Sequence, residues 1–173
     1  MALYMKIDGI DKVEGSATVE DVGGKKGLIP IDSMAYGSGR AISMTTGATS
    51  AGEMSTVSLS EISISRSTDG ASAILQTLQF APGDLGKTMF FLVAKNDRGG
   101  KGLIVSLMVE LTEARLSSYS LSASGGATSE AFSIAYSAIS ISHYRELPGG
   151  KVEKGDVVKF NVSKGMLESQ AKV

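Results

Sequence analysis

Hydrophobic and polar residues alternate with a period of two over much of this chain, and the longest such run covers residues 101–121. Its apolar side chains fall on every second position, at Leu103, Val105, Leu107, Val109 and Leu111. Successive side chains of a β-strand point to opposite faces, so this spacing predicts a strand with one wholly apolar face. We expect so long a strand to lie at the centre of a sheet, because alone it would leave its backbone groups unpaired.

The same alternation predicts further strands at residues 2–8, 27–36, 56–66, 87–96, 130–146 and 156–162. In two of them the apolar positions change parity, near Ser60–Glu61 and between Tyr136 and Ile139, as happens when a β-bulge inserts one residue. Pro30 has no N–H, which places its strand at an edge or at a bulge. The strand 87–96 is apolar on both faces, and the glycines that follow it predict a hairpin turn to the central strand.

Residues 67–80 have a helical period instead. The stripe that would dock on the sheet consists of Ala71, Ile74, Leu75 and Leu78. Ser67 or Thr68 is expected to cap the first turn, and Asp69 suits the positive end of the helix dipole. About seven strands and one short α-helix predict a mainly β fold, an antiparallel barrel or two-sheet sandwich. We expect residues 1–173 to form a single domain.

The segment 37–55 consists mostly of small residues and carries only two charges, Arg40 and Glu53. Its large apolar side chains are Ile42, Met44 and Met54. Loops of this length without secondary structure are uncommon in compact domains. The composition leaves two interpretations open, a mobile loop or an arm that packs on another molecule.

Composition narrows the function classes. The chain has no Cys, no Trp and one His, which excludes a disulfide framework and a thiolate metal site. A net charge of −1 argues against a general nucleic-acid binder. No apolar run approaches the roughly 20 residues of a membrane span. Lys6 and Asp8 stand where a signal peptide would have its apolar segment, so we expect neither a membrane anchor nor a classical export signal.

Residues 83–88 read Gly-Asp-Leu-Gly-Lys-Thr, but a phosphate-binding loop would need glycine in place of Ala81 and a helix after Thr88. His143 is the only possible imidazole base, and no Gly-x-Ser-x-Gly elbow accompanies it. Glu110 and Glu130 are not paired by any spacing, and no metal-ligand spacing occurs. We therefore predict no catalytic residue, no metal and no cofactor, and the chain reads as a scaffold.

Serines alternate with the apolar residues of two predicted strands, at Ser58, Ser60, Ser63, Ser65, Ser140 and Ser142. An ordinary solvent-facing sheet would carry more Lys, Glu and Thr. A small neutral face packs closely on a neighbour, or lines a channel that does not grip its contents. A plain solvent-facing sheet remains the alternative.

The order of these segments resembles the Hcp family, the haemolysin-coregulated tube proteins of bacterial type VI secretion. The resemblance covers nearly the whole chain, and it rests on order and spacing more than on any single motif. The segments that carry it are ALYMKIDGI, VEGSATVED, a strand ending in AYG, VSLSEISISRSTDGASAILQTL, LIVSLMVELTEARLSSYSLS and EAFSIAYSAISISHYRE. In the last segment the family pattern is matched by Glu130, Phe132, Ile134, Tyr136, Ile139 and Tyr144.

The resemblance implies a β-barrel with a flanking helix, assembled into hexameric rings that stack as a tube. It implies sheath, spike and baseplate proteins as partners, and small effectors carried in the lumen. The residues that it places toward the lumen are Ser33, Ala35 and Gly37. It assigns residues 38–55 to ring stacking, with Arg40, Ile42, Met44 and Met54 as contacts. The implied location is the cytoplasm before assembly, followed by export through the type VI machine without a signal peptide.

Two alternatives compete with this reading. A contractile phage tail-tube protein would share the fold and the ring symmetry. A hydrolase on a β-barrel would depend on His143 and one of the 25 serines.

Overall fold

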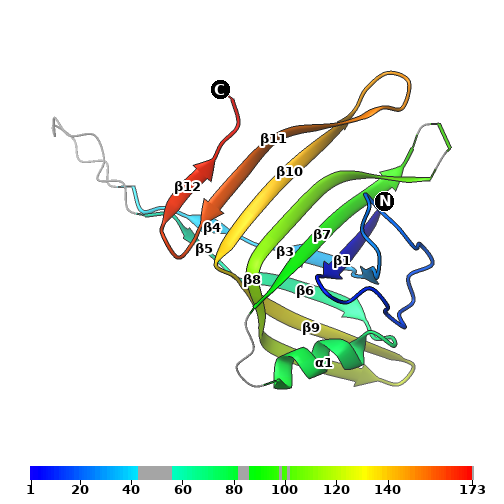
Figure 1. The fold of residues 1–173 in the computed structure, drawn as a ribbon. Helices are drawn as coiled ribbons and strands as arrows, with labels where there is room; N and C mark the ends of the chain where they lie inside the picture. Colours follow the sequence, from blue (N-terminus) through cyan, green and yellow to red (C-terminus); the bar gives the residue numbers. More distant parts are fainter. Residues whose placement is uncertain (43–55, 82–85, 98, 101, 173) are drawn as a thin grey trace.

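The computed structural model describes residues 1–42, 56–81, 86–97, 99–100 and 102–172 (Figure 1). In these ranges the chain forms twelve strands and one helix. In chain order the elements are β1 Ala2–Ile7, β2 Ile29–Pro30, β3 Ser33–Ala35, β4 Ser38–Gly39, β5 Ser58–Leu59, β6 Ile62–Ser67, α1 Ser72–Phe80, β7 Lys87–Asn96, β8 Leu103–Ser124, β9 Ala127–Ala135, β10 Ala138–Glu146, β11 Val152–Asn161 and β12 Met166–Ser169. The prediction of a mainly β, antiparallel fold with one short helix is confirmed.

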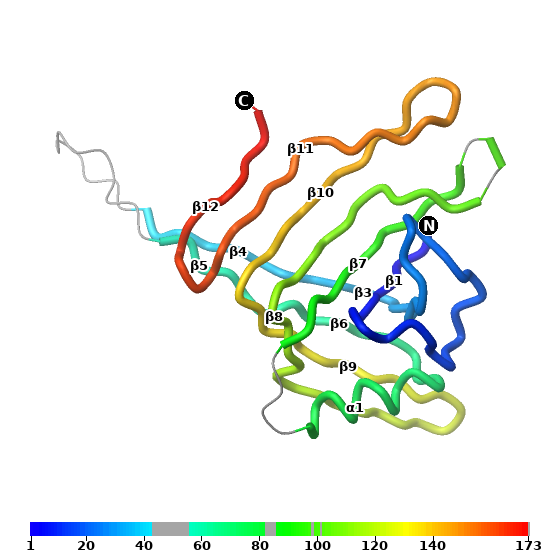
Figure 2. Tube along the Cα trace, in the orientation of Figure 1, coloured from blue at the N-terminus to red at the C-terminus, as the bar shows by residue number. Residues whose placement is uncertain are grey.

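The long strand β8 belongs to two sheets. Its first half pairs with β7 and β10 in a large sheet of order β12-β11-β10-β8-β7-β1-β2. Its second half pairs with β9 in a small sheet of order β8-β9-β6-β3. All these pairs are antiparallel, and β4 pairs with β5 apart from both sheets. Figure 2 shows the large sheet rising above the small one, with β8 passing between them.

After the turn that follows β8, the chain runs back antiparallel to it: β9 pairs with the second half of β8 and β10 with the first half. These three strands therefore form one long hairpin that belongs to both sheets. Ala135 lies opposite Arg115, and Ala138 lies opposite Thr112. At this corner Glu113 has a left-handed backbone, with φ of 50°. Gly86 lies so close that a Cβ atom there would clash with the backbone of Glu113. Glycine is therefore required at residue 86 by the close approach of two backbones.

The main core lies between the two sheets and α1. It includes Met5 and Ile7 of β1, Phe91 of β7 and Leu75 of α1, each at most 1% exposed. A second cluster lies on the opposite face of the large sheet, under residues of the segment 17–28; its members are Tyr4, Val22, Leu28, Leu92, Ala94 and Val105. Strand β7 is thus buried on both faces, as its sequence predicted.

Several predicted boundaries need correction. The helix begins at Ser72, so Ser67 and Thr68 do not cap it; Ser67 ends β6 instead. The backbone N–H of Ala71 is accepted by the Asp69 carboxylate at 2.9 Å, so Asp69 serves the helix start from outside its first turn. The predicted strand 27–36 is two short strands, β2 and β3, with Pro30 on the sheet edge as expected.

The two changes of parity mark breaks rather than bulges within one strand. Ser60–Glu61 separates β5 from β6, and Tyr136–Ser137 separates β9 from β10. In each case the chain passes to a different sheet, or to a different part of one. The last predicted strand begins earlier, at Val152, and a further short strand that the alternation did not predict, β12, follows it. In the hairpin turn Gly100 and Gly102 have positive φ.

The helix that the structure describes is neither long enough nor apolar enough to cross a membrane.

Candidate functional site

The small sheet presents one face made almost wholly of serine. Cross-strand partners lie on the same face of a sheet, so the register identifies its members. They are Ser33 and Ala35 of β3, Ser63, Ser65 and Ser67 of β6, Ser129, Ala131 and Ser133 of β9, and Ser118, Ser120 and Ser122 of β8. We call these eleven residues the serine face; each is exposed or half-buried.

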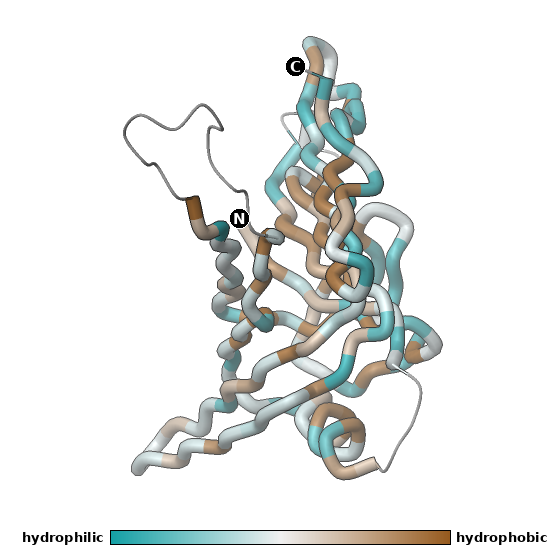
Figure 3. Tube along the Cα trace, turned by 90° about the vertical axis from the view of Figure 1, so that its left-hand side faces the viewer, coloured by the Kyte–Doolittle hydropathy of each residue, from teal (hydrophilic) through white to brown (hydrophobic). Residues whose placement is uncertain are grey.

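The alternation of the strands produces this face. The residues between the serines point into the main core, where Ile62, Ile64, Phe132 and Ile134 are at most 2% exposed. Burial of those side chains fixes the register, because a slip of one residue would expose them and bury the serines. Between its two ends the outward side therefore carries no charge and no side chain longer than that of serine. In Figure 3 the lower hairpin of β8 and β9 is mostly pale, while the large sheet carries many brown residues.

Hydroxyl groups on the serine face bond mainly within the sheet. The Ser33 and Ser65 hydroxyl oxygens lie 2.6 Å apart across β3 and β6. Ser120 donates to the carbonyl oxygen of Ala131 at 3.3 Å. Charged residues occur only at the two ends of the face: Asp32 near Ser67, and Glu61 with Arg115 beyond the other end. The surface is thus polar but locally neutral.

The structure places the three lumen candidates as follows. Ser33 and Ala35 lie on the serine face, opposite Ser65 and Ser63. Gly37 lies just beyond β3, where its N–H donates to the Ser60 hydroxyl at 2.8 Å. The assignment of these three residues to a lumen stays a prediction.

The serine pattern read from the sequence is only partly assembled here. Ser63 and Ser65 join the face, but Ser58 belongs to the separate β4–β5 pair and Ser142 is buried in the large sheet. The serines contributed by β8 and β9 were missed, although the run from Ser118 to Ser124 alternates with period two.

Of the stacking-loop candidates, Arg40 and Ile42 are exposed next to β4, and Ile42 is 65% exposed. Met44 and Met54 lie outside the described residues. The stacking role of all four residues stays a prediction.

His143 does not meet a serine in the described part of the chain. It lies in β10 opposite Leu107, and its ring is exposed and forms no hydrogen bond there. Glu110 and Glu130 do not form a carboxylate pair either. Glu110 lies opposite Ser140 in the large sheet, whereas Glu130 is buried beside Arg66 in the small one. Within the described ranges no three His, Asp or Glu side chains are grouped to hold a metal ion.

A buried ionic cluster lies between the small sheet and α1. The Arg66 guanidinium is 1% exposed and forms ion pairs with Glu130, at 3.1 Å, and with Asp69. Glu130 also accepts hydrogen bonds from Ser72 of α1, at 2.9 Å, and from the Tyr119 hydroxyl. The cluster joins the helix to β6, β8 and β9, and its groups are largely paired, as buried charges require.

Two pKa values reflect this cluster. Burial raises the pKa of the Asp69 carboxyl, but hydrogen bonds from Ser16 and Arg66 lower it by more, so the net shift is downward. Burial, followed by the bond to Glu130, raises the pKa of Tyr119. These shifts belong to a structural cluster, because its charged groups are paired with one another and with neighbouring hydroxyl groups.

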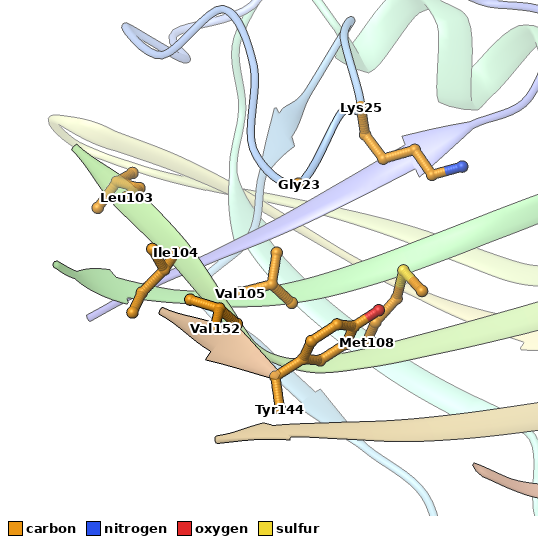
Figure 4. Close-up of a pocket in the computed structure, with 8 residues that line it drawn as sticks. All are labelled: Gly23, Lys25, Leu103, Ile104, Val105, Met108, Tyr144 and Val152. Carbon is orange, nitrogen blue, oxygen red and sulfur yellow. The ribbon is translucent and has the colours of Figure 1, made fainter. Parts of the chain in front are cut away.

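A pocket of about 290 Å³ opens on the outer face of the large sheet (Figure 4). Val105, Met108, Tyr144 and Val152 converge on it, and only the Tyr144 hydroxyl brings a polar group among them. The Lys25 amine points away, over the Phe90 ring at 3.7 Å. The wall of this pocket is therefore mainly apolar, and the amine of its one charged lining residue, Lys25, is directed to the Phe90 ring.

Comparison with protein families gave a match to the family described as "Type VI secretion system effector, Hcp", over residues 4–143. The chain belongs to the Hcp family. The sequence match covers most of the chain, and Hcp is also the family that the order of the sequence segments resembles. The Hcp chain described here is accordingly a tube protein of type VI secretion.

Solved structures agree with this fold. "Structure of a type six secretion system protein" matches with a TM-score of 0.79 at 19% identity, covering 96% of this Hcp chain and 99% of that one. Hcp1 from Salmonella typhimurium matches with a TM-score of 0.65 at 19% identity, covering 96% and 97%. A type VI secretion system effector from Yersinia pestis gives 0.56 at 15% identity, covering 92% and 99%. A comparison with curated proteins gave no match. At these identities the structures show a shared fold.

Proposed function

We propose that this chain forms hexameric rings that stack into the inner tube of a type VI secretion system, with the serine face lining the lumen. The observation that carries the proposal is the serine face itself. A passage for folded or unfolded cargo needs a wall without protruding or sticky side chains. Four neighbouring strands that present nine serines and two alanines provide such a wall.

The open edges of the small sheet support a closed ring. In the part of the chain that the structure describes, strand β3 pairs only with β6, and the second half of β8 pairs only with β9. Two open edges at opposite sides of one sheet invite pairing with other chains, and closure into a ring removes them. Copies placed side by side would continue the serine face around a lumen, with Ser33, Ala35 and Gly37 along it.

We further infer that the whole chain is one tube domain that carries small effectors in the lumen and has no catalytic activity of its own. Sheath, spike and baseplate proteins are its expected partners. The chain is expected in the cytoplasm before assembly and outside the cell after firing. The family match favours this reading over a phage tail tube, and the lack of a Ser–His pair in the described residues speaks against the hydrolase.

The lumen assignment can be tested by thiol labelling, because the chain has no cysteine of its own. We expect Ser120→Cys to react with a small maleimide in assembled rings but slowly with a bulky polymer maleimide. Lys151→Cys, in the exposed turn between β10 and β11, should react with both. Native mass spectrometry and negative-stain images of the same samples establish the ring. Rings whose Ser120→Cys reacts equally with both reagents would refute the lumen assignment, and a persistent monomer would refute the ring.

For residues 38–55 we propose the ring-stacking role, with Arg40, Ile42, Met44 and Met54 as contacts. Deleting residues 40–53 should leave single rings intact and reduce the length of stacked tubes seen by electron microscopy. Loss of the soluble fold on deletion would show that the segment belongs to the core instead.

A further inference from the structure

A second, smaller pocket of about 240 Å³ opens on the serine face near β3. Its wall includes Asp32, Ser65, Ser120, Ser122, Ser129 and Ala131. Pockets for small ligands and cofactors usually have roughly 300–1,000 Å³. This pocket is smaller than that range, so its size suits a single side chain of a larger molecule.

Asp32 gives the pocket its charge. Its backbone N–H donates to the Ser65 carbonyl oxygen at 2.9 Å, which fixes it at the end of β3. Among the described residues, its carboxylate accepts one hydrogen bond, from the Ser67 hydroxyl at 3.3 Å. An ionised carboxylate has about four acceptor positions, so most of its capacity remains for a ligand.

The other charged residues at this pocket do not offset Asp32. Arg66 and Glu130 also border it, but they belong to the inward-facing positions of β6 and β9. Their side chains are buried and paired with each other at 3.1 Å. The pocket therefore presents one exposed carboxylate among serine hydroxyls, which themselves accept hydrogen bonds.

We propose that this pocket binds a lysine or arginine side chain of a polypeptide lying along the serine face. The cation forms a charge-assisted hydrogen bond with Asp32, and the neighbouring hydroxyl of Ser65 on β6 offers an acceptor for another of its N–H groups. The inference rests on the proposed function, in which that polypeptide is cargo in the lumen. A ring would then hold several equivalent acidic pockets, so cargo with several basic residues binds more tightly than each contact alone allows.

The test uses two fluorescent Gly-Ser peptides. One contains several lysines, and the matched peptide contains N-acetyl-lysines at the same positions, so that the two differ only in the charge of these side chains. Binding to the full-length chain is followed by fluorescence anisotropy at low and high salt. We expect the lysine peptide to bind and the acetylated peptide to fail. Asp32→Asn should weaken binding of the lysine peptide by about threefold to tenfold. Higher salt should weaken it as well.

Glu61→Gln is the matched control, because Glu61 is an exposed carboxylate at the opposite end of the same face and does not line the pocket. It should leave binding unchanged. Equal binding of the two peptides, or equal effects of Asp32→Asn and Glu61→Gln, would overturn the inference. The pocket lies within one chain, so these results are readable whether or not rings form. Imaging of the same sample tests the ring separately.

Discussion

Glu130→Gln is the substitution that most directly tests the buried cluster under α1. It keeps the size of the side chain but removes the charge that faces Arg66 at 3.1 Å, where both side chains are at most 1% exposed. Within the described ranges the guanidinium then keeps Asp69 as its one ion-pair partner. Leaving a buried charge without its partner costs about 3–5 kcal/mol of unfolding free energy.

This cost can be converted into a melting temperature. Unfolding entropy of about 2.1 cal/mol/K per residue gives about 0.36 kcal/mol/K for a chain of 173 residues. The expected loss is therefore about 8–14 °C in Tm. The assay is thermal and urea unfolding at one fixed protein concentration, because assembly also shifts Tm.

Glu153→Gln is the matched control. The same chemical change there breaks the Arg145–Glu153 pair, whose atoms are 2.6 Å apart but whose side chains are 71% and 45% exposed. An exposed pair is worth below about 1 kcal/mol. The double variant Arg66→Met with Glu130→Gln should recover most of the lost stability, because it removes both fully buried charges, while Asp69 keeps its hydrogen bonds from the backbone N–H groups of Ser16 and Ala71. A Glu130→Gln variant as stable as Glu153→Gln would refute the reasoning.

Three further predictions concern other features. The pKa of Asp69 is lower in the folded chain than in the unfolded chain, so the ionised carboxylate stabilises the fold above the unfolded pKa of about 4. This stabilisation is lost as the pH falls through the folded pKa. Urea unfolding measured at a series of pH values should therefore show a smaller acid loss of stability in Asp69→Asn than in the unaltered chain. Burial raises the pKa of Tyr136 to about 12. The stability that its neutral side chain contributes to the fold is therefore lost as the pH rises above about 10, the pKa of an unfolded tyrosine. In an absorbance titration, Tyr136→Phe should lack the last step of tyrosinate formation. Gly86→Ala should lower Tm because its Cβ meets the backbone at Glu113, whereas Gly125→Ala, with open space around it, should not; equal melting curves would contradict this.

The alternation of residues sufficed to predict most strands, because burial of one face imposes a period of two on the sequence. It also located the breaks at Ser60–Glu61 and Tyr136–Ser137. It did not show that the chain changes sheets there, because parity is a local signal and sheet membership depends on partners far along the chain. The serine face was only half found for the same reason: it exists only through the pairing of four strands from distant segments.

The buried ionic cluster was missed because charged residues in a strand usually face solvent. A signal was nevertheless present. Arg66 shares the parity of Ile62 and Ile64, and Glu130 shares that of Phe132 and Ile134. A charge of each sign on the apolar side of two strands is what a buried pair between them requires.

Because β8 is a member of both sheets, the two sheets cannot move apart from each other unless this strand bends or breaks. The two walls of the molecule share one continuous backbone that turns the corner at Glu113. In the tube that we propose, a subunit pushed from one end would transmit the force along this continuous strand and not across an interface between separate strands. Partial opening under force would have to begin at the margins, at β12 or β3, and not in the middle.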